Sequence, residues 1–177
     1  MPNPFPKSLL RHGDVLLYEH RSHQSFFARG IRLVEGSRIV HCGIAQAASD
    51  DTGTYLLVLE QLAERTFEPV KYYRADVGEV IHVVRPCKYP PKTDESRFCR
   101  LGYGYWGIVD SLVNHLMGHI LLGHWRKRRM LGLLKPNNVI CSQLVGLCLG
   151  LEDWATLEPD DYYNDRVRFE YLGVLDA

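Results

Sequence analysis

The sequence has no excess of charge of either sign: 21 Lys and Arg residues balance 21 Asp and Glu residues over 177 positions. A chain without net charge creates no global field, so general attraction to nucleic acid or to an anionic surface is not expected. The only dense basic run is Arg126, Lys127, Arg128 and Arg129. It is either a solvated helix end or a local contact for phosphate, anionic lipid or an anionic cell-wall polymer.

The sequence also lacks paired cysteines and a signal peptide. None of its five cysteines lies two residues from another, as metal-binding and redox pairs usually do, and the odd number argues against a disulfide framework. Pro2, Pro4 and Pro6 interrupt the region where a secretory signal needs an unbroken apolar stretch. We therefore expect a cytoplasmic protein, or one that is delivered as part of a larger particle.

No internal repeat is visible, and the length suits one domain over residues 1–177. Apolar runs with turn signals around them predict strands at 14–18, 39–45, 55–60, 79–84 and 166–175. Helical periodicity predicts a long helix at 109–121 and a second helix at 141–149, which Gly150 ends. Polar residues interrupt the apolar stripe of 109–121, which favours a core helix over a membrane span. The fold class predicted is α+β.

His41 and Cys42 lie in a predicted strand, where alternate side chains point to opposite faces. Cys42 shares its face with aliphatic residues and is predicted to be a buried, inert thiol. His41 shares its face with Gly43, which leaves room beside the ring. A partner for His41 is therefore expected from elsewhere in the chain rather than from Cys42.

Cys141 opens a predicted helix, so its sulfur would lie near unpaired amides and the positive end of the helix dipole. Both effects favour thiolate over thiol, and a neighbouring imidazole would lower the thiol pKa further. A cysteine at a helix start is by itself more often structural than reactive, because free cysteine is among the most buried residue types.

Three motifs resemble one known family. They are His-Gly-Asp-Val-Leu-Leu at 12–17, Ser-Arg-Ile-Val-His-Cys-Gly-Ile at 37–44 and Ile-Cys-Ser-Gln-Leu-Val at 140–145. Together they resemble the opening turn, the histidine strand and the nucleophile helix of circularly permuted NlpC-like cysteine hydrolases, also called YiiX-like. The resemblance spans nearly the whole chain, and it implies a papain-like fold in which an antiparallel sheet packs against the nucleophile helix.

The resemblance implies a site in which Cys141 is the nucleophile and His41 the base. The third residue in such proteins often follows the histidine strand, and Glu60 occupies the matching place. It would accept a hydrogen bond from the imidazole and support the imidazolium. Glu64 and Glu68 are alternatives.

The segment Gly-Tyr-Gly-Tyr-Trp at 102–106 resembles one that lines the substrate groove in related domains, although core packing explains its aromatics equally well. The residues expected to bind substrate are Tyr103, Tyr105, Trp106 and Ser142. His115 and His119 are one helical turn apart, but no glutamate follows His115 as in metalloproteases. No metal and no cofactor is expected.

The resemblance implies hydrolysis of an amide bond, with bacterial cell-wall peptides as the most frequent substrate class. Two other functions remain open. Some relatives move acyl groups on lipids or thioesters, and the amphipathic helix at 109–121 followed by basic residues fits a membrane surface. The domain could also be a non-catalytic structural or binding part of a larger assembly.

Overall fold

The computed structural model describes residues 3–20, 38–51, 53–61, 65–69, 79–88, 102–103 and 138–176. Several of the sequence predictions lie outside these residues. They are the long helix at 109–121, the basic run at 126–129, the histidines at 115 and 119, and Tyr105, Trp106 and Glu64.

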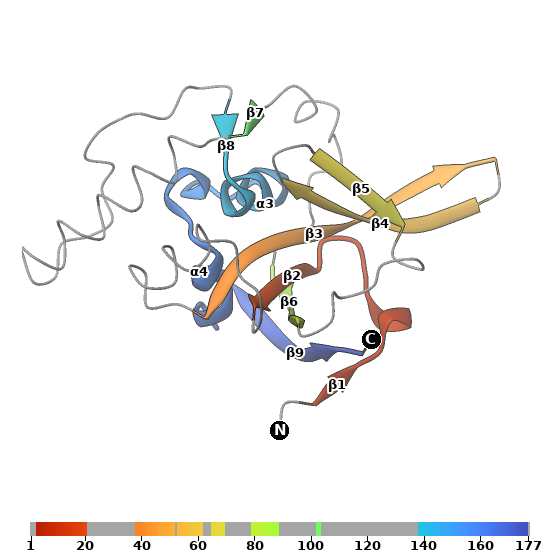
Figure 1. The fold of residues 1–177 in the computed structure, drawn as a ribbon, viewed down its shortest axis with the longest axis horizontal. Coiled ribbons are helices and arrows are strands. Elements are labelled where there is room, and N and C mark those ends of the chain that lie inside the picture. Colours follow the sequence, from red (N-terminus) through yellow and green to blue (C-terminus); the bar gives the residue numbers. More distant parts are fainter. Residues whose placement is uncertain are drawn as a thin grey trace, which may run out of the picture.

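Seven strands form one sheet in the order β1-β9-β6-β2-β3-β4-β5 (Figure 1). Their bounds are β1 Pro4–Phe5, β2 Val15–His20, β3 Ile39–Asp50, β4 Gly53–Gln61, β5 Arg65–Pro69, β6 Glu79–Pro86 and β9 Phe169–Leu175. Neighbouring strands are antiparallel except for β1 and β9, which run parallel. The sheet therefore brings strands from both ends of the chain to one edge.

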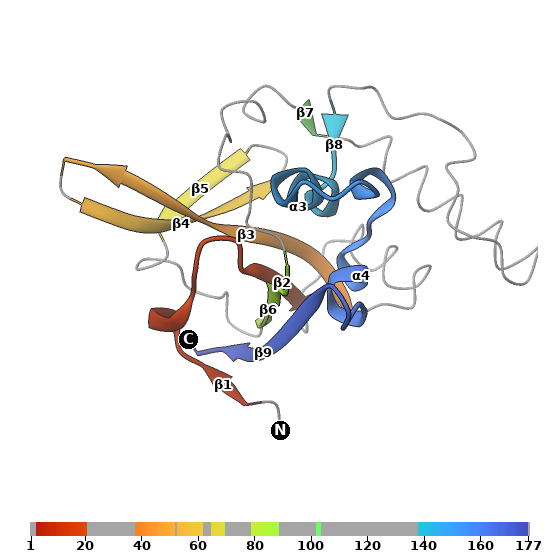
Figure 2. The same cartoon turned by 180° about the vertical axis from the view of Figure 1, so that it is seen from behind.

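The remaining elements are the helices η1 (Lys7–Leu9), α3 (Cys141–Leu149), η5 (Trp154–Thr156) and α4 (Pro159–Asn164), and the short parallel pair β7 (Gly102–Tyr103) and β8 (Asn138–Val139). Helix α3 packs against β3 and β4, whereas α4 packs against β2, β3 and β9 (Figures 1 and 2). Among the described residues, no helix is both long enough and apolar enough to cross a membrane.

The predicted strands at 14–18, 39–45, 55–60 and 79–84 are present as β2, β3, β4 and β6, and the predicted closing strand is present as β9. Strand β3 continues five residues further than predicted, to Asp50, because it pairs with β4 along the whole hairpin. Gly53, the first residue of β4 after the hairpin turn, has a φ of 132°, which favours glycine. Four of the described strands were not predicted: β1, β5 and the short pair β7 and β8.

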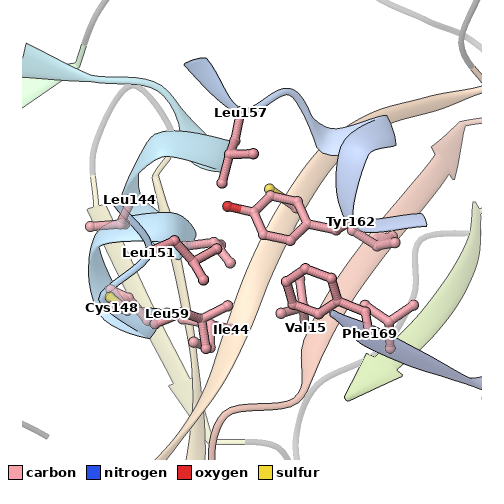
Figure 3. Close-up of a cluster of buried hydrophobic side chains, with 14 of the residues drawn as sticks. Val15, Ile44, Leu59, Leu144, Cys148, Leu151, Leu157, Tyr162 and Phe169 are labelled. Carbon is pink, nitrogen blue, oxygen red and sulfur yellow. The ribbon is translucent and has the colours of Figure 1, made fainter. Parts of the chain in front are cut away.

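Side chains are buried on both faces of the sheet. Figure 3 shows part of the helix-side cluster, in which Val15, Ile44 and Leu59 meet side chains of α3. On the other face, Leu16 and Val83 belong to a second cluster that includes residues from β1 and the end of β9. A strand that is covered on both faces reads as a continuous apolar run instead of an alternating one. This explains why the segment at 15–18 is apolar throughout.

The motif at 12–17 forms the turn into β2. Gly13 has a φ of 90°, which favours glycine. Asp14 is fully buried and makes two 2.7 Å hydrogen bonds to the Arg85 guanidinium, and it also accepts a bond from the Arg11 backbone amide. The bidentate pair joins the start of β2 to the end of β6. The aspartate of this motif therefore has a structural role.

Candidate active site

Cys141 is the first residue of α3, as the sequence predicts. The preceding residue, Ile140, has an extended backbone, and the first helical hydrogen bond runs from the Leu144 amide to the Ile140 carbonyl, 3.0 Å long. The amide of Cys141 therefore precedes the helical ladder and lies at the positive end of the helix dipole. The helix ends at Gly150, whose φ of 66° is left-handed, which confirms the predicted stop.

The first turn of α3 is held by the segment that follows the helix. The Ser142 hydroxyl donates to the Leu157 carbonyl at 2.6 Å, and the Gln143 amide donates to the Ala155 carbonyl at 3.0 Å. Tyr162 in α4 donates to the Ser142 carbonyl at 2.6 Å, and its ring lies beside Leu157 in Figure 3. Burial raises the pKa of Tyr162 well above its usual value, so its hydroxyl stays protonated and able to donate. These bonds fix the backbone that carries the cysteine.

Ser142 differs from its predicted role. The sequence suggested that it contacts substrate, but the residue is fully buried and its hydroxyl is bonded to a backbone carbonyl. Its side chain faces the interior because the second position of α3 points towards η5 and α4. Ser142 therefore has a structural role, and its side chain has no exposed surface that a substrate could contact.

His41 lies in β3 and contacts Glu60 from β4. The Nε2 atom of His41 is 3.2 Å from Oε2 of Glu60, and the His41 side chain is 20% exposed while Glu60 is buried. Because Nε2 faces the carboxylate, Nδ1 is the ring nitrogen that can exchange a proton with another group. Of the three glutamates considered from sequence, Glu60 thus has the expected contact; the side chains of Glu64 and Glu68 lie outside the described set.

Gly43 provides the space for this contact. It lies opposite Glu60 in the β3–β4 register, and a Cβ atom at Gly43 would come within 2.8 Å of Cγ of Glu60 and 3.2 Å of the Leu59 carbonyl. Any larger residue would therefore push the Glu60 side chain away from its place. The glycine two positions after His41 in the histidine motif has a physical reason in this geometry.

Tyr18 is a member of the site that sequence reasoning missed. Its hydroxyl donates a short hydrogen bond to Oε1 of Glu60, and its ring centroid is 5.1 Å from that of His41. Tyr18 lies in β2 directly opposite His41. The only signal that could have found it is the register between β2 and β3, which a single sequence does not reveal.

Electrostatics couple Cys141 to two neighbours. Hydrogen bonding with Cys42 lowers the pKa of the Cys141 thiol well below its usual value, and the charge of His41 and hydrogen bonding with His41 lower it further, against the opposing effect of burial. Burial alone would lower the pKa of His41, but the charges of Cys141 and Glu60 and their hydrogen bonds raise it to about 10. The thiolate and imidazolium are thus the favoured forms of the pair.

Cys42 is buried, as predicted, but the prediction that its thiol would be inert and separate from the site was wrong. The residue is fully buried, and burial raises the pKa of its thiol well above the usual value, but it interacts with Cys141. Alternation itself places Cys42 near α3, because Cys42 lies with Ile44 in the helix-side cluster. The side chain that strict alternation would place on the other face is His41, and the β2–β3 register shifts just before it and leaves Val40 without a partner in β2. Such a bulge bends and twists a strand, and it can redirect a side chain. His41 and Cys42 can therefore both reach Cys141.

The predicted substrate aromatics are located only in part. The backbone of Tyr103 pairs with Val139, two residues before Cys141, so β7 runs beside the entry to α3. Nothing further on the aromatic segment falls in the described residues.

Within the described residues, no group of three or more His, Cys, Asp or Glu side chains is arranged to hold a metal ion.

A second histidine on the same sheet has a similar set of neighbours. Nε2 of His82 is 3.1 Å from Oε2 of Glu19, and its Nδ1 is 3.0 Å from the Tyr171 hydroxyl. The ring also packs edge-on against Tyr163, over which the Arg166 guanidinium lies. Both ring nitrogens of His82 are thus occupied by hydrogen-bonding partners.

A scan against models of known protein families gave no match, and no curated protein sequence matched the chain. Support for a function therefore comes from the geometry of the site.

Proposed function

We propose that this chain is a cysteine hydrolase with a papain-like fold of the permuted NlpC type. Cys141 is the nucleophile, His41 the base and Glu60 the residue that orients the base. The observation that carries the proposal is the position of Cys141 at the start of α3, beside an imidazole whose other nitrogen faces a buried carboxylate. Nucleophile, base and orienting group are the three parts that covalent acyl transfer needs.

The chemistry begins from the thiolate–imidazolium pair, in which the Cys141 proton is already held by His41, at Nδ1. The thiolate then attacks the acyl carbon of an amide, and the backbone N–H of Cys141 is a donor for the developing oxyanion. The His41 imidazolium gives its proton to the departing amine, which leaves a thioester on Cys141. Water loses a proton to His41 as it attacks the thioester, and the free carboxylic acid is released.

Glu60 supports both proton transfers. It accepts a hydrogen bond from Nε2, which leaves Nδ1 as the nitrogen that exchanges a proton with the thiol. Its negative charge also stabilises the imidazolium, in line with the raised pKa of His41. Loss of the carboxylate would therefore impair turnover more than substrate binding.

We further propose a peptide amide as the substrate, with bacterial cell-wall peptides as the first candidates. The alternatives are acyl transfer on a lipid or thioester and a non-catalytic role. The lipid alternative depends on residues 109–129, which lie outside the described part of the chain, whereas hydrolysis depends on side chains within it. The thiolate–imidazolium pair favours an enzyme over a purely structural domain, because perturbed pKa values concentrate at functional sites.

The test is a digest of muropeptides by the purified protein, read by mass spectrometry, beside Cys141→Ser and Cys148→Ala variants. Cys148 lies in the same helix and is fully buried, so it controls for loss of a thiol from α3. We expect cleavage by the wild type and by Cys148→Ala, and none by Cys141→Ser. Cleavage that survives in folded Cys141→Ser would remove the proposed nucleophile.

A further inference from the structure

We infer that Tyr18 is a positioning residue of the proposed site, acting on His41 through Glu60 and through contact with the imidazole ring. The inference rests on the proposed function and adds a fourth side chain to it. Tyr18 comes from a third strand, so the site depends on the β2–β3 pairing as well as on the β3–β4 hairpin.

The geometry gives Tyr18 two contacts with the site. Its hydroxyl binds Oε1 of Glu60 while Oε2 of the same carboxylate binds His41. Its ring lies 5.1 Å from the His41 ring at an angle of 45°. One residue therefore binds the carboxylate oxygen that does not contact His41 and also limits the space in which the imidazole can move.

These contacts matter because a carboxylate with only one fixed oxygen can rotate about its terminal torsion, which has broad minima. With both oxygens bonded, Glu60 keeps Oε2 directed at Nε2 of His41. The imidazolium that forms when Cys141 loses its proton then finds its counter-charge already in place, without rearrangement. Such fixed supporting bonds are what keep a catalytic geometry within the tolerance that chemistry requires.

The hydroxyl of Tyr18 can be separated from its ring by experiment. Tyr18 is 4% exposed and packs in the cluster on the face away from α3, together with Leu16 and Ile81. A phenylalanine would fill nearly the same volume, so Tyr18→Phe retains this packing and the ring contact with His41. It removes the hydroxyl and with it the bond to Glu60.

The sheet also offers a matched control. Tyr171→Phe removes a hydroxyl that contacts the other histidine, His82, at 3.0 Å, and Tyr171 is outside the proposed site. A general effect of losing a tyrosine hydroxyl from this sheet would therefore appear in both variants. An effect on Cys141 should appear only in Tyr18→Phe.

The experiment measures the rate at which Cys141 reacts with iodoacetamide as a function of pH, by site-resolved mass spectrometry. It compares the wild type with Tyr18→Phe, Glu60→Gln, the Tyr18→Phe/Glu60→Gln double variant, Tyr171→Phe and His41→Ala. Thermal unfolding of each variant verifies that it is folded. The readout needs no substrate, so it is independent of which amide the protein cleaves.

We expect Tyr18→Phe to slow labelling of Cys141 at neutral pH by about three- to tenfold and to move the midpoint to higher pH, as loss of a charge-assisted hydrogen bond would. Tyr171→Phe should match the wild type. The double variant should be no slower than Glu60→Gln alone, because Tyr18 acts through Glu60.

Two results would overturn the inference: wild-type labelling by folded Tyr18→Phe, or a double variant in which the two effects multiply. If instead His41→Ala leaves the labelling of Cys141 unchanged, the proposed function itself fails. A response to His41→Ala and Glu60→Gln without one to Tyr18→Phe removes only the role of Tyr18.

Discussion

The sheet carries two histidines with the same kinds of neighbour and different chemical possibilities. His41 contacts Glu60 through Nε2, and the charge of Cys141 contributes to its raised pKa. His82 contacts Glu19 through Nε2, but a tyrosine hydroxyl occupies its Nδ1. A histidine, a glutamate and a tyrosine are thus not enough for nucleophilic chemistry. The ring also needs a nitrogen that remains available to a thiol.

The cluster of residues around His41 and the cluster around His82 include adjacent residues of the same elements. In β2, Tyr18 bonds to Glu60 while its neighbour Glu19 bonds to His82. In α4, Tyr162 bonds to the backbone of α3 while the next residue, Tyr163, packs against His82. Alternation along β2 directs the adjacent side chains of Tyr18 and Glu19 to opposite sides of the strand. Substitutions in one cluster can therefore be compared with matched substitutions in the other.

The largest expected difference is between His41→Ala and His82→Ala. Removal of His41 takes away the proposed base, so we expect the rate of amide hydrolysis to fall by about 10³-fold or more. Removal of His82 leaves Glu19 without this partner and should lower the free energy of unfolding by about 1–3 kcal/mol while hydrolysis continues. Steady-state rates and denaturant unfolding of both variants measure this contrast. Comparable loss of activity in the two folded variants would remove the distinction between the clusters.

The next prediction concerns the space beside Glu60. Gly43→Ala places a methyl group within 2.8 Å of Cγ of Glu60, so the carboxylate must move from His41. We expect kcat to fall by about tenfold or more with a smaller change in KM, because orientation of the base is lost.

Gly53→Ala serves as the control for this change. The new Cβ has no neighbour within 4 Å, but the φ of 132° is strained for alanine. The control should lose about 1 kcal/mol of stability and keep its activity. Wild-type kinetics in Gly43→Ala, with stability unchanged, would show that Glu60 has more freedom than the structure implies.

A smaller effect is expected from pH alone. The folded pKa of His41 is raised from 6.5 to about 10, so its protonated form contributes stability that is full below pH 6.5 and lost as the pH rises towards 10. Hydrolysis needs this imidazolium to protonate the departing amine. We therefore expect the hydrolysis rate to decline as the pH passes about 10. Iodoacetamide labelling needs only the thiolate and should not decline there.

The two pH profiles, recorded on protein whose fold is verified by circular dichroism at each pH, separate these cases. A decline in hydrolysis near pH 7 instead would mean that His41 retains an ordinary pKa. Parallel decline of labelling and hydrolysis would indicate unfolding rather than titration of the base.

The sequence predicted those features of the fold and the site that depend on a single strand, helix or hairpin. The apolar runs predicted strands β2, β3, β4 and β6, and a cysteine followed by a helical pattern ending in Gly150 predicted α3. Glu60 was predictable as a neighbour of His41 because the two lie in one hairpin, whose pairing follows from its turn.

The features that were missed depend on how distant elements pair. Tyr18 joins the site through the register of β2 against β3, and Cys42 meets Cys141 because α3 packs on the face of β3 that carries Cys42. Neither this register nor this packing is encoded in the local pattern of apolar residues. The buried side of Ser142 depends on contacts with the segment after α3, which helical periodicity alone does not specify.

The most direct test of the account compares the cysteines within one protein. Cys141 is expected to react with iodoacetamide at a pH well below that needed by the exposed Cys87, while the buried Cys42 and Cys148 react slowly. His41→Ala should raise the pH at which Cys141 reacts and leave Cys87 unchanged. If Cys141 and Cys87 instead label over the same pH range in folded protein, and His41→Ala has no effect on either, Cys141 is not an activated nucleophile.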